Sequence, residues 1–584
     1  MLRQFLLNTS GNFAIISALT LPVLIGSAGL AIDYTQLSRA RTELQIVTDA
    51  AVLAAANRTV SPAERQRTFE EMLGAADTHM AFTIIDSDVD IDEGLNSIKL
   101  RGEAKARVDL HFLGRTGHDI VSVIAEATQS TKRVELGLVL DNTGSMGQAG
   151  IDALKSASLS LVDAIEGGST GGKDVKIALV PFVTAVNIKG EGFDEAWIDT
   201  KGEARYNGWS FLDSTMRADR TAGKLIDQAF ANSASAMNAG PSSSCIDIAE
   251  ALLASGNDDD DDDDDDDDKK DKDKDKESVK KKSSKEACEE AAKLPHAMHL
   301  FKSSETTWKG CVEARPEPYN LSLTPPDATK PDTLFVPYFA PDEAGNGMSD
   351  GGNNDQGFNN SWLHDLVEHS DNGKKQRSTL KYVIPTSKKV VEDKNQTLGP
   401  NRACPTPVVP LTHDFQKVRD GINAMKFWNG SGTNISEGLA WGWRVMTPEA
   451  PYTEAAPFDP ENVSKFLVLM TDGRNVSYGN KNTVNKSDFG SYGFLSDKRI
   501  AGLTNAAQVE TKLNSWTLEM CTAMKAQGIQ IFTVVYKETN TAVQNLFKAC
   551  ASDPAKFHMA SNTAALEKAF AEIGTTMSPL RLVR

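Results

Sequence analysis

The sequence lacks several motifs that would identify a common enzyme class. It contains no C-x-x-C pair, no H-E-x-x-H and no G-x-x-x-x-G-K-[ST] loop, which disfavours zinc knuckles, zincin-type proteases and P-loop NTPases. Basic residues are also scarce, since 62 lysines and arginines stand against 80 aspartates and glutamates, for a net charge of −18. Because binding to phosphate groups needs a basic surface, we expect no nucleic-acid partner.

Cysteine is rare, with six residues in a chain of 584. An even, dispersed set favours disulfide bonds if the compartment is oxidising. Six cysteines allow many pairings, so their number alone leaves the connectivity open. The set is Cys245, Cys288, Cys311, Cys404, Cys521 and Cys550.

The N-terminal region contains an uncharged apolar stretch, Phe13–Ile32, that is long enough to cross a hydrocarbon core as a helix. Residues 34–57 contain no Gly or Pro and are rich in alanine, so the helix should continue past the membrane. This continuation favours a retained, single-pass anchor within residues 1–57. The alternative is a cleaved signal peptide, with Gly29 and Ala31 at the cleavage point.

The chain then changes pattern twice. Residues 58–131 contain short runs in which apolar and polar residues alternate, which predicts a small β-rich module. In residues 132–584, apolar strand patterns alternate with helical patterns, which predicts an α/β fold with a doubly wound, mostly parallel sheet. The expected strands are 136–140, 175–182, 466–470 and 529–535, and the expected helices are 151–165, 414–425, 435–446, 506–527 and 563–574.

A long insertion, at about 187–411, interrupts this alternation and is rich in Pro, Gly, Asn, Asp and Ser. At its centre, residues 257–286 hold eleven consecutive aspartates, Asp258–Asp268, followed by a lysine-rich tract. Blocks of like charge repel themselves, so we expect a disordered, solvated linker there.

Candidate metal ligands follow the first of the predicted strands. Asp141, Thr143 and Ser145 alternate directly after the apolar run that ends at Leu140. Ligands of open α/β sheets bind beyond the carboxyl ends of the strands, and hard oxygen donors suit a small cation such as Mg²⁺. Two later loops add Thr433, before a predicted helix, and Asp472, after a predicted strand.

Together, D-x-T-x-S, G-T-N and a strand ending in T-D-G resemble the metal-ion-dependent adhesion site of von Willebrand factor A domains. The resemblance implies a Rossmann-like sheet and a site for Mg²⁺, or for Mn²⁺ or Ca²⁺, at Asp141, Thr143, Ser145, Thr433 and Asp472. It implies direct metal contact from the hydroxyls, aspartates acting mainly through bound waters, and one position left for a carboxylate of a protein partner. The chain departs from the family in having Thr143 where serine is usual and in the long gap before Thr433.

The N-terminal segment, from SGNFAIISALTLPVLIGSAGLAIDY through LQIVTDAAVLAAA, resembles TadG-like proteins of the Flp (tight adherence) pilus system. Three segments of the insertion, WKGCVEARP, TLFVPYFAPDE and CPTPVVPLT, resemble the same family. Related pseudopilins are cut after a glycine and carry a glutamate five residues later. Here Ile16 is the fifth residue after Gly11, which favours a permanent anchor.

The resemblance also bears on the cysteines, because Cys311 and Cys404 lie within two of these segments and are expected to pair. We expect Cys521 to pair with Cys550 across a predicted strand, which leaves Cys245 with Cys288. The implied location is the bacterial inner membrane, with residues 13–32 as the anchor and the bulk of the chain in the periplasm.

These features predict a membrane-anchored, metal-dependent binding protein that acts with pilus-assembly components or in adhesion. One alternative is a structural scaffold of the pilus machinery whose metal site is dispensable. Another is a metal-dependent hydrolase, which is disfavoured because no His or Glu base lies in the motif loops. We therefore expect the protein not to be an enzyme.

Overall fold

The computed structural model divides into two compact units, one of residues 1–133, 164–174 and 575–584 and one of residues 134–163 and 175–574. The residues that the structure describes are 9–56, 62–77, 82–93, 97–110, 112, 118–130, 132–167, 175–223, 227–236, 243–255, 283–345, 358–365, 371–384, 397–430, 432–577 and 580–583.

The first unit is an antiparallel sheet covered by helices. Its strand order is β1–β2–β3–β14, and the strands are β1 Thr83–Glu93, β2 Ser97–Asp109, β3 His118–Ser130 and β14 Leu580–Val583. Alternate residues of β2 and β3 are buried, as the period-two pattern requires. The helices α2 (Thr9–Ala55) and α3 (Pro62–Asp77) supply the rest of this core, for example Val52 and Phe69.

Two expectations for this unit differ from the structure. Instead of short runs, residues 97–109 form one long strand, β2, because Glu103 and Lys105 keep the alternation of buried and more exposed side chains. The C-terminal strand β14 pairs with β3, so residues 575–584 belong to this unit and not to the segment 132–584. The strand β14 has only four residues and no long apolar run, so the sequence pattern did not predict this pairing.

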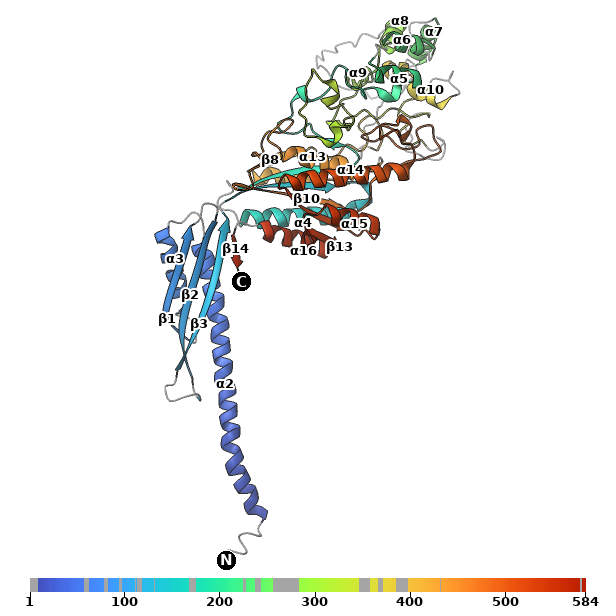
Figure 1. Cartoon of the computed structure of the whole chain (residues 1–584). Helices are drawn as coiled ribbons and strands as arrows, with labels where there is room; N and C mark the ends of the chain where they lie inside the picture. The colour runs from blue at the N-terminus through green and yellow to red at the C-terminus, as the bar shows by residue number, and fades with distance from the viewer. Residues whose placement is uncertain are drawn as a thin grey trace, which may run out of the picture. The chain divides into compact units, whose positions relative to one another are not determined.

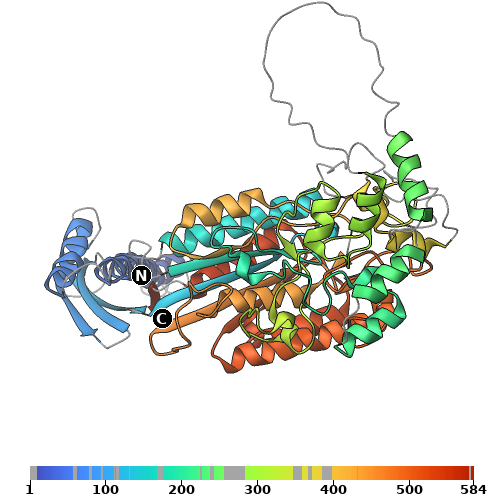
Figure 2. The same cartoon turned by 90° about the horizontal axis from the view of Figure 1, so that it is seen from above.

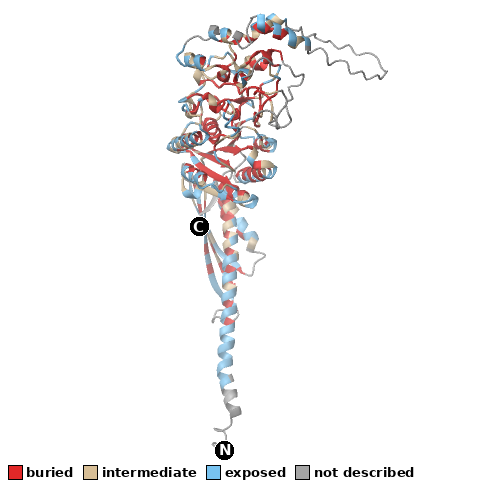
Figure 3. Ribbon diagram, turned by 90° about the vertical axis from the view of Figure 1, so that its right-hand side faces the viewer, coloured by how far each residue is buried: buried red, intermediate tan, exposed pale blue. Residues whose placement is uncertain are grey.

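The N-terminal half of α2 exposes apolar side chains, whereas its C-terminal half packs on the sheet (Figure 3). A segment within Ala18–Ala55 is the one candidate span in the described part of the chain, judged by length and composition. Together with the helix continuing through residue 55, this supports membrane anchoring. The exposed apolar residues are Ile16, Leu19, Leu21, Val23, Leu24, Ile25, Leu30 and Ile32.

The second unit is built on a mixed sheet with the order β13–β12–β10–β4–β5–β6–β7. The pairs β4–β5, β10–β12 and β12–β13 are parallel, whereas β6, β7 and β8 join antiparallel. The four predicted strands are present as β4 Arg133–Asp141, β5 Val175–Phe182, β10 Val463–Thr471 and β12 Gln530–Tyr536. Four further strands are β6 Val186–Asn187, β7 Cys311–Val312, β8 Val409–Thr412 and β13 Phe557–Ala560.

Helices lie on both faces of this sheet (Figures 1 and 2). α13 and α14 cover one face, and α4 and α16 the other, which leaves the strands almost completely buried (Figures 1 and 3). The five predicted helices are present as α4 Gly147–Gly167, α12 Phe415–Ala424, α13 Ile435–Val445, α14 Ala506–Ala526 and α16 Thr563–Met577, and α15 Thr541–Cys550 was not predicted. The observed fold is therefore α/β with a mixed sheet.

Residues 187–411 carry short elements that pack onto the sheet unit. The strand β7 (Cys311–Val312) pairs with β6, and the helices range from α5 (Ser214–Thr221) to α11 (Leu380–Val383). The aspartate run lies outside the described residues. The expected disordered linker, 257–286, is wrong at its C-terminal end. Ser283 caps the helix α8 (Ser284–Ala291) in a capping box with Glu286.

The three expected disulfides are confirmed. Cys245 pairs with Cys288, Cys311 with Cys404, and Cys521 with Cys550, and no described cysteine is free. The Cys311–Cys404 bond ties β7 to the segment that leads into β8. The bonds support an oxidising compartment for this unit.

Two glycines let α13 approach the sheet closely. A Cβ atom on Gly438 would lie 2.5 Å from the Phe182 ring, and one on Gly442 would lie 2.4 Å from Val139 Cγ2. We expect Gly442→Ala to lower the free energy of unfolding by about 1–3 kcal/mol through overpacking. Thermal unfolding checks this, with Gly167→Ala in α4 as the control, because nothing lies within 4 Å of that Cβ position. Equal stability of the two variants would contradict the prediction.

Candidate functional site

The site begins where β4 ends, at Asp141. The chain turns there through a short 3-10 helix, Gly144–Met146, into α4. Two backbone hydrogen bonds fix the turn, from Asn142 N to Phe182 O at 2.8 Å and from Trp428 N to Asn142 O at 2.8 Å. The turn is therefore held between the end of β5 and the loop before Thr433.

The Asp141 carboxylate is completely buried and accepts two hydrogen bonds. Thr143 N donates to Oδ1 at 2.8 Å, and the Thr471 hydroxyl donates to Oδ2 at 2.5 Å. Thr471 is the last residue of β10, the neighbour of β4 in the sheet. Asp141 thus joins the carboxyl ends of two adjacent strands.

A chain of side-chain hydrogen bonds continues from this turn to Asp472. Thr143 Oγ1 lies 3.0 Å from Ser145 Oγ, and Ser145 Oγ donates to Asp472 Oδ1 at 2.8 Å. Asp141 and Asp472 are 331 positions apart in the sequence, yet the fold brings them into one network. Ser145 is exposed, so the network is open to solvent on one side.

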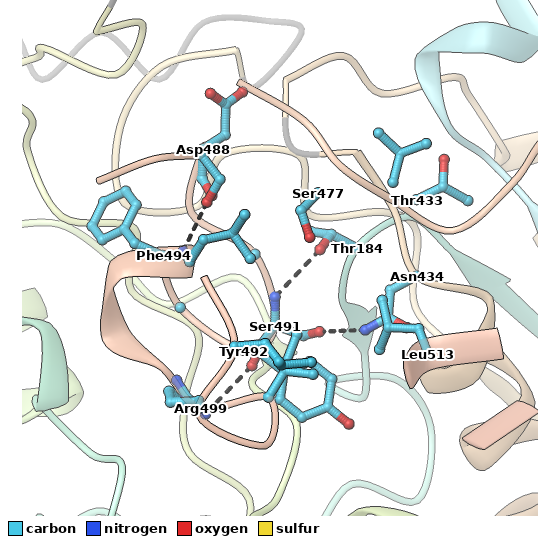
Figure 4. Close-up of a pocket in the computed structure, with 17 residues that line it drawn as sticks. Thr184, Thr433, Asn434, Ser477, Asp488, Ser491, Tyr492, Phe494, Arg499 and Leu513 are labelled. Carbon is cyan, nitrogen blue, oxygen red and sulfur yellow. Dashed lines mark hydrogen bonds between the residues drawn. The ribbon is translucent and has the colours of Figure 1, made fainter. Parts of the chain in front are cut away.

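Thr433, the fifth predicted residue, lies in a neighbouring loop. It belongs to β9 (Gly432–Thr433), which pairs with β11 (Val476–Ser477), four residues beyond Asp472. Asn434 N donates to Val183 O, directly after β5, so this loop sits at the same strand ends. Thr433 shares no side-chain hydrogen bond with the other four residues in the described structure. It lines a small pocket whose lining includes none of the other four residues (Figure 4).

Burial raises the affinity of both carboxylates for protons. Burial raises the pKa of Asp472 to about 7, with a further contribution from the negative charge of Asp141. Burial also raises the pKa of Asp141, while hydrogen bonds from Thr143 and Thr471 oppose that shift. Within the described residues, no lysine or arginine forms an ion pair with either carboxylate.

This arrangement fits a divalent cation. Two buried or half-buried carboxylates without a basic partner form a concentration of negative charge that a cation would neutralise. The hydroxyls of Thr143 and Ser145 lie between them, and carboxylates and hydroxyls are the hard oxygen donors that Mg²⁺ prefers. The described residues contain no group of three His, Cys, Asp or Glu side chains suited to a metal, so hydroxyls would have to complete the set.

The sequence did not single out three further residues of the site. Thr471 orients Asp141, and Glu538, after β12, adds negative charge near Asp472. Asn429 approaches Gly144 so closely that a Cβ atom there would lie 2.1 Å from its side-chain oxygen. The T-D-G motif could have indicated Thr471, because this threonine ends the strand that lies next to Asp141. Glu538 and Asn429 lie in loops that contain no recognisable motif.

The fold and the site define a class: an α/β domain with paired acidic and hydroxyl side chains at the strand ends, in a chain with an N-terminal apolar helix. Residues 11–58 match the family model described as putative Flp pilus-assembly TadE/G-like. The resemblance to TadG-like proteins that the N-terminal segment predicted is therefore confirmed. The comparison with curated proteins gives no match.

Solved structures similar to this chain include pilus proteins. The pilus adhesin SpaC from Lactobacillus rhamnosus GG is 9% identical, with a TM-score of 0.30 over 86% of this chain and 36% of its own. The vWF domain of the type V pili tip protein Mfa5 from Porphyromonas gingivalis is 10% identical, with a TM-score of 0.29 over 76% of this chain and 95% of that domain. This chain spans about a third of the length of SpaC.

Proposed function

We propose that this chain is a membrane-anchored binding protein whose α/β domain is of the doubly wound von Willebrand A type and binds a partner through a divalent cation. The observation that carries the proposal is the hydrogen-bonded chain Asp141–Thr143–Ser145–Asp472 at the ends of β4 and β10. The TadE/G-like match of residues 11–58 supports a role in Flp pilus assembly or surface adhesion.

In this proposal Thr143, Ser145 and Thr433 contact the cation, and Asp141 and Asp472 balance its charge, mainly through waters. Mg²⁺ is the expected ion, with Mn²⁺ or Ca²⁺ as substitutes. When bound, the ion supplies an open coordination position that a carboxylate of a protein partner can fill. The exposure of Ser145 supports access from solvent.

We place the anchor, residues 13–32, in the inner membrane and the bulk of the chain in the periplasm. The disulfides support this orientation, because they persist in oxidising compartments. The apolar side chains exposed along the N-terminal half of α2 support a lipid environment for that half.

Removal of the metal is the direct test. Tagged full-length protein in detergent is expected to retain its partner from solubilised membranes in 2 mM Mg²⁺ and to lose it in EDTA. Thr433→Ala should weaken retention in Mg²⁺, because one of three direct hydroxyl ligands is removed. Thr329→Ala, an exposed threonine of the insertion, is the control. Equal recovery with Mg²⁺ and EDTA would refute the metal bridge.

A second candidate is a scaffold that acts through its anchor alone. It is favoured by the family match, which covers only the N-terminal segment. Pilus assembly in cells that carry Asp141→Ala separates the candidates, since a scaffold would support normal assembly whereas a metal-dependent binder would not.

We infer that the site binds and does not catalyse. No general base stands among the described side chains of the site. The sequence holds two G-x-S-x-G matches, Gly167–Gly171 and Gly347–Gly351, and the serine of each lies outside the described residues. Mg²⁺-dependent release of p-nitrophenol from acetyl or phosphate esters by the purified chain would overturn this inference.

A further inference from the structure

A second candidate binding site lies in the insertion, in an open groove of about 870 Å³. One wall is formed by α5 (Ser214–Thr221) and the residues before it, and another by α10 (Asn372–Arg377). A loop of residues 484–498 closes the third side. None of the five predicted metal ligands lines this groove.

The floor of the groove is fixed by Asp497. Its carboxylate accepts hydrogen bonds from the Ser210 hydroxyl at 2.6 Å and from Arg217 Nη2 at 2.7 Å. Its backbone oxygen accepts from the Trp209 ring nitrogen at 3.1 Å. Since Arg217 and Asp497 neutralise each other, the groove is preorganised and neither charge is left over for a ligand.

Arg377, at the end of α10, has no such partner. Its guanidinium is half-buried, and its Nε is buried without a hydrogen bond among the described residues. Burial lowers its pKa, Asp371, Asp213 and Asp497 oppose that shift, and the positive charge of Arg217 adds to it. A cation held beside another cation, with no acceptor, points to an anion from outside.

The other charged side chains of the lining are ion-paired or hydrogen-bonded, except Lys498. Arg205 is paired with Asp332 at 2.8 Å, and Asp213 caps α5 by accepting from Thr215 N and Met216 N. Lys498 is exposed and has no acidic partner in the described structure. Two unpaired cations, Arg377 and Lys498, therefore remain in a chain whose net charge is −18.

The size and chemistry of the groove favour a peptide over a small anion. Besides the cations, the lining includes the half-buried Tyr206, and Val484, which is 46% exposed. A small anion would engage Arg377 and leave these surfaces empty. A peptide with acidic side chains would engage both.

We propose that this groove binds an acidic peptide segment of a partner protein. The Arg377 guanidinium forms a bidentate ion pair with one carboxylate of the peptide, and Lys498 binds a second carboxylate. The planar fork of arginine matches a carboxylate in this way, whereas lysine acts as a point charge. Peptide binding in this groove does not require the metal. An experiment can therefore disprove the peptide site without disproving the proposed metal bridge, and the reverse.

The test titrates fluorescent hexaglutamate into the full chain in detergent, with EDTA present. Arg377→Gln is expected to weaken binding about tenfold, and Arg377→Lys to weaken it less, because the charge stays while the fork is lost. Lys498→Asn should weaken binding a few-fold and should reduce its dependence on salt. The thermal midpoint of Arg377→Gln should match the wild type, since no hydrogen bond is removed.

Lys481→Ala is the matched control, because Lys481 is an exposed lysine of the preceding loop outside the lining. It should bind hexaglutamate like the wild type, and hexaglutamine should not bind. Equal affinity of Arg377→Gln and the wild type, or an equal loss in Lys481→Ala, would overturn the site. Displacement of the peptide by an equal concentration of tripolyphosphate would overturn the assignment to a peptide.

Discussion

Asp141→Asn is expected to weaken Mg²⁺ binding by about 100-fold or more while leaving the metal-free protein at least as stable as the wild type. Asparagine can still accept the hydrogen bond from Thr143 N, so the turn should keep its geometry. The substitution removes a completely buried charge that has no basic partner in the described structure. It also removes the negative charge that, after burial, contributes to the raised pKa of Asp472.

The stability of the metal-free protein should depend on pH for the same reason. Asp472 has a pKa of about 7 in the folded chain, above the value of 3.8 for a free side chain. The folded state therefore holds the proton more tightly than the unfolded state, and stability falls as the pH rises from about 4 to about 7. Asp141→Asn should reduce this loss of stability at higher pH. Saturating Mg²⁺ should restore the lost stability in the wild type but not in Asp141→Asn.

Calorimetric titration with Mg²⁺ and thermal unfolding between pH 4 and pH 8 measure both effects. Asp152→Asn is the control, since Asp152 is an exposed carboxylate of α4 that accepts a hydrogen bond from the Gln148 side chain. It should bind Mg²⁺ like the wild type. A full Mg²⁺-induced rise in the thermal midpoint of Asp141→Asn would show that Asp141 does not contribute to a metal site.

The strands that build the site were predictable because they are buried on both faces. β4, β5, β10 and β12 are continuous apolar runs, a pattern that few other structures produce. The edge strand β13 was missed because Phe557 and His558 are half-buried and Met559 is exposed, so no apolar run marks it. The two-residue strands β6 and β7 are too short for any period to be visible.

The site was predictable to a similar extent, and for a different reason. Asp141, Thr143, Ser145 and Asp472 stand at strand ends, and parallel strands bring such residues to one edge regardless of their distance in the sequence. Thr433 follows no strand of the sheet, so its distance from the others depends on how the β9–β11 pair folds. The groove of Arg377 was not predictable, because its walls come from separate short elements whose packing no local pattern records.

Lys465→Met should be the most destabilising of the single substitutions considered, by about 3–5 kcal/mol. Lys465 Nζ lies 2.5 Å from Glu135 Oε2 and also donates to Met446 O and Ala456 O, and both charged side chains are buried. They join β10 to β4 at the ends of the strands away from Asp141 and Asp472. Without Lys465, the Glu135 carboxylate would stay buried without its counter-charge.

A double-mutant cycle distinguishes this ion pair from simple packing. Glu135→Gln combined with Lys465→Met should recover much of the loss, because no charge is then left uncompensated. Lys417→Met breaks the exposed pair with Glu191, at 2.6 Å, and should cost less than about 1 kcal/mol. Urea unfolding of the full chain in detergent measures all four variants. If the double variant were as unstable as the sum of the single ones, the two side chains would act independently, and the link between β4 and β10 would rest on backbone pairing and apolar packing alone.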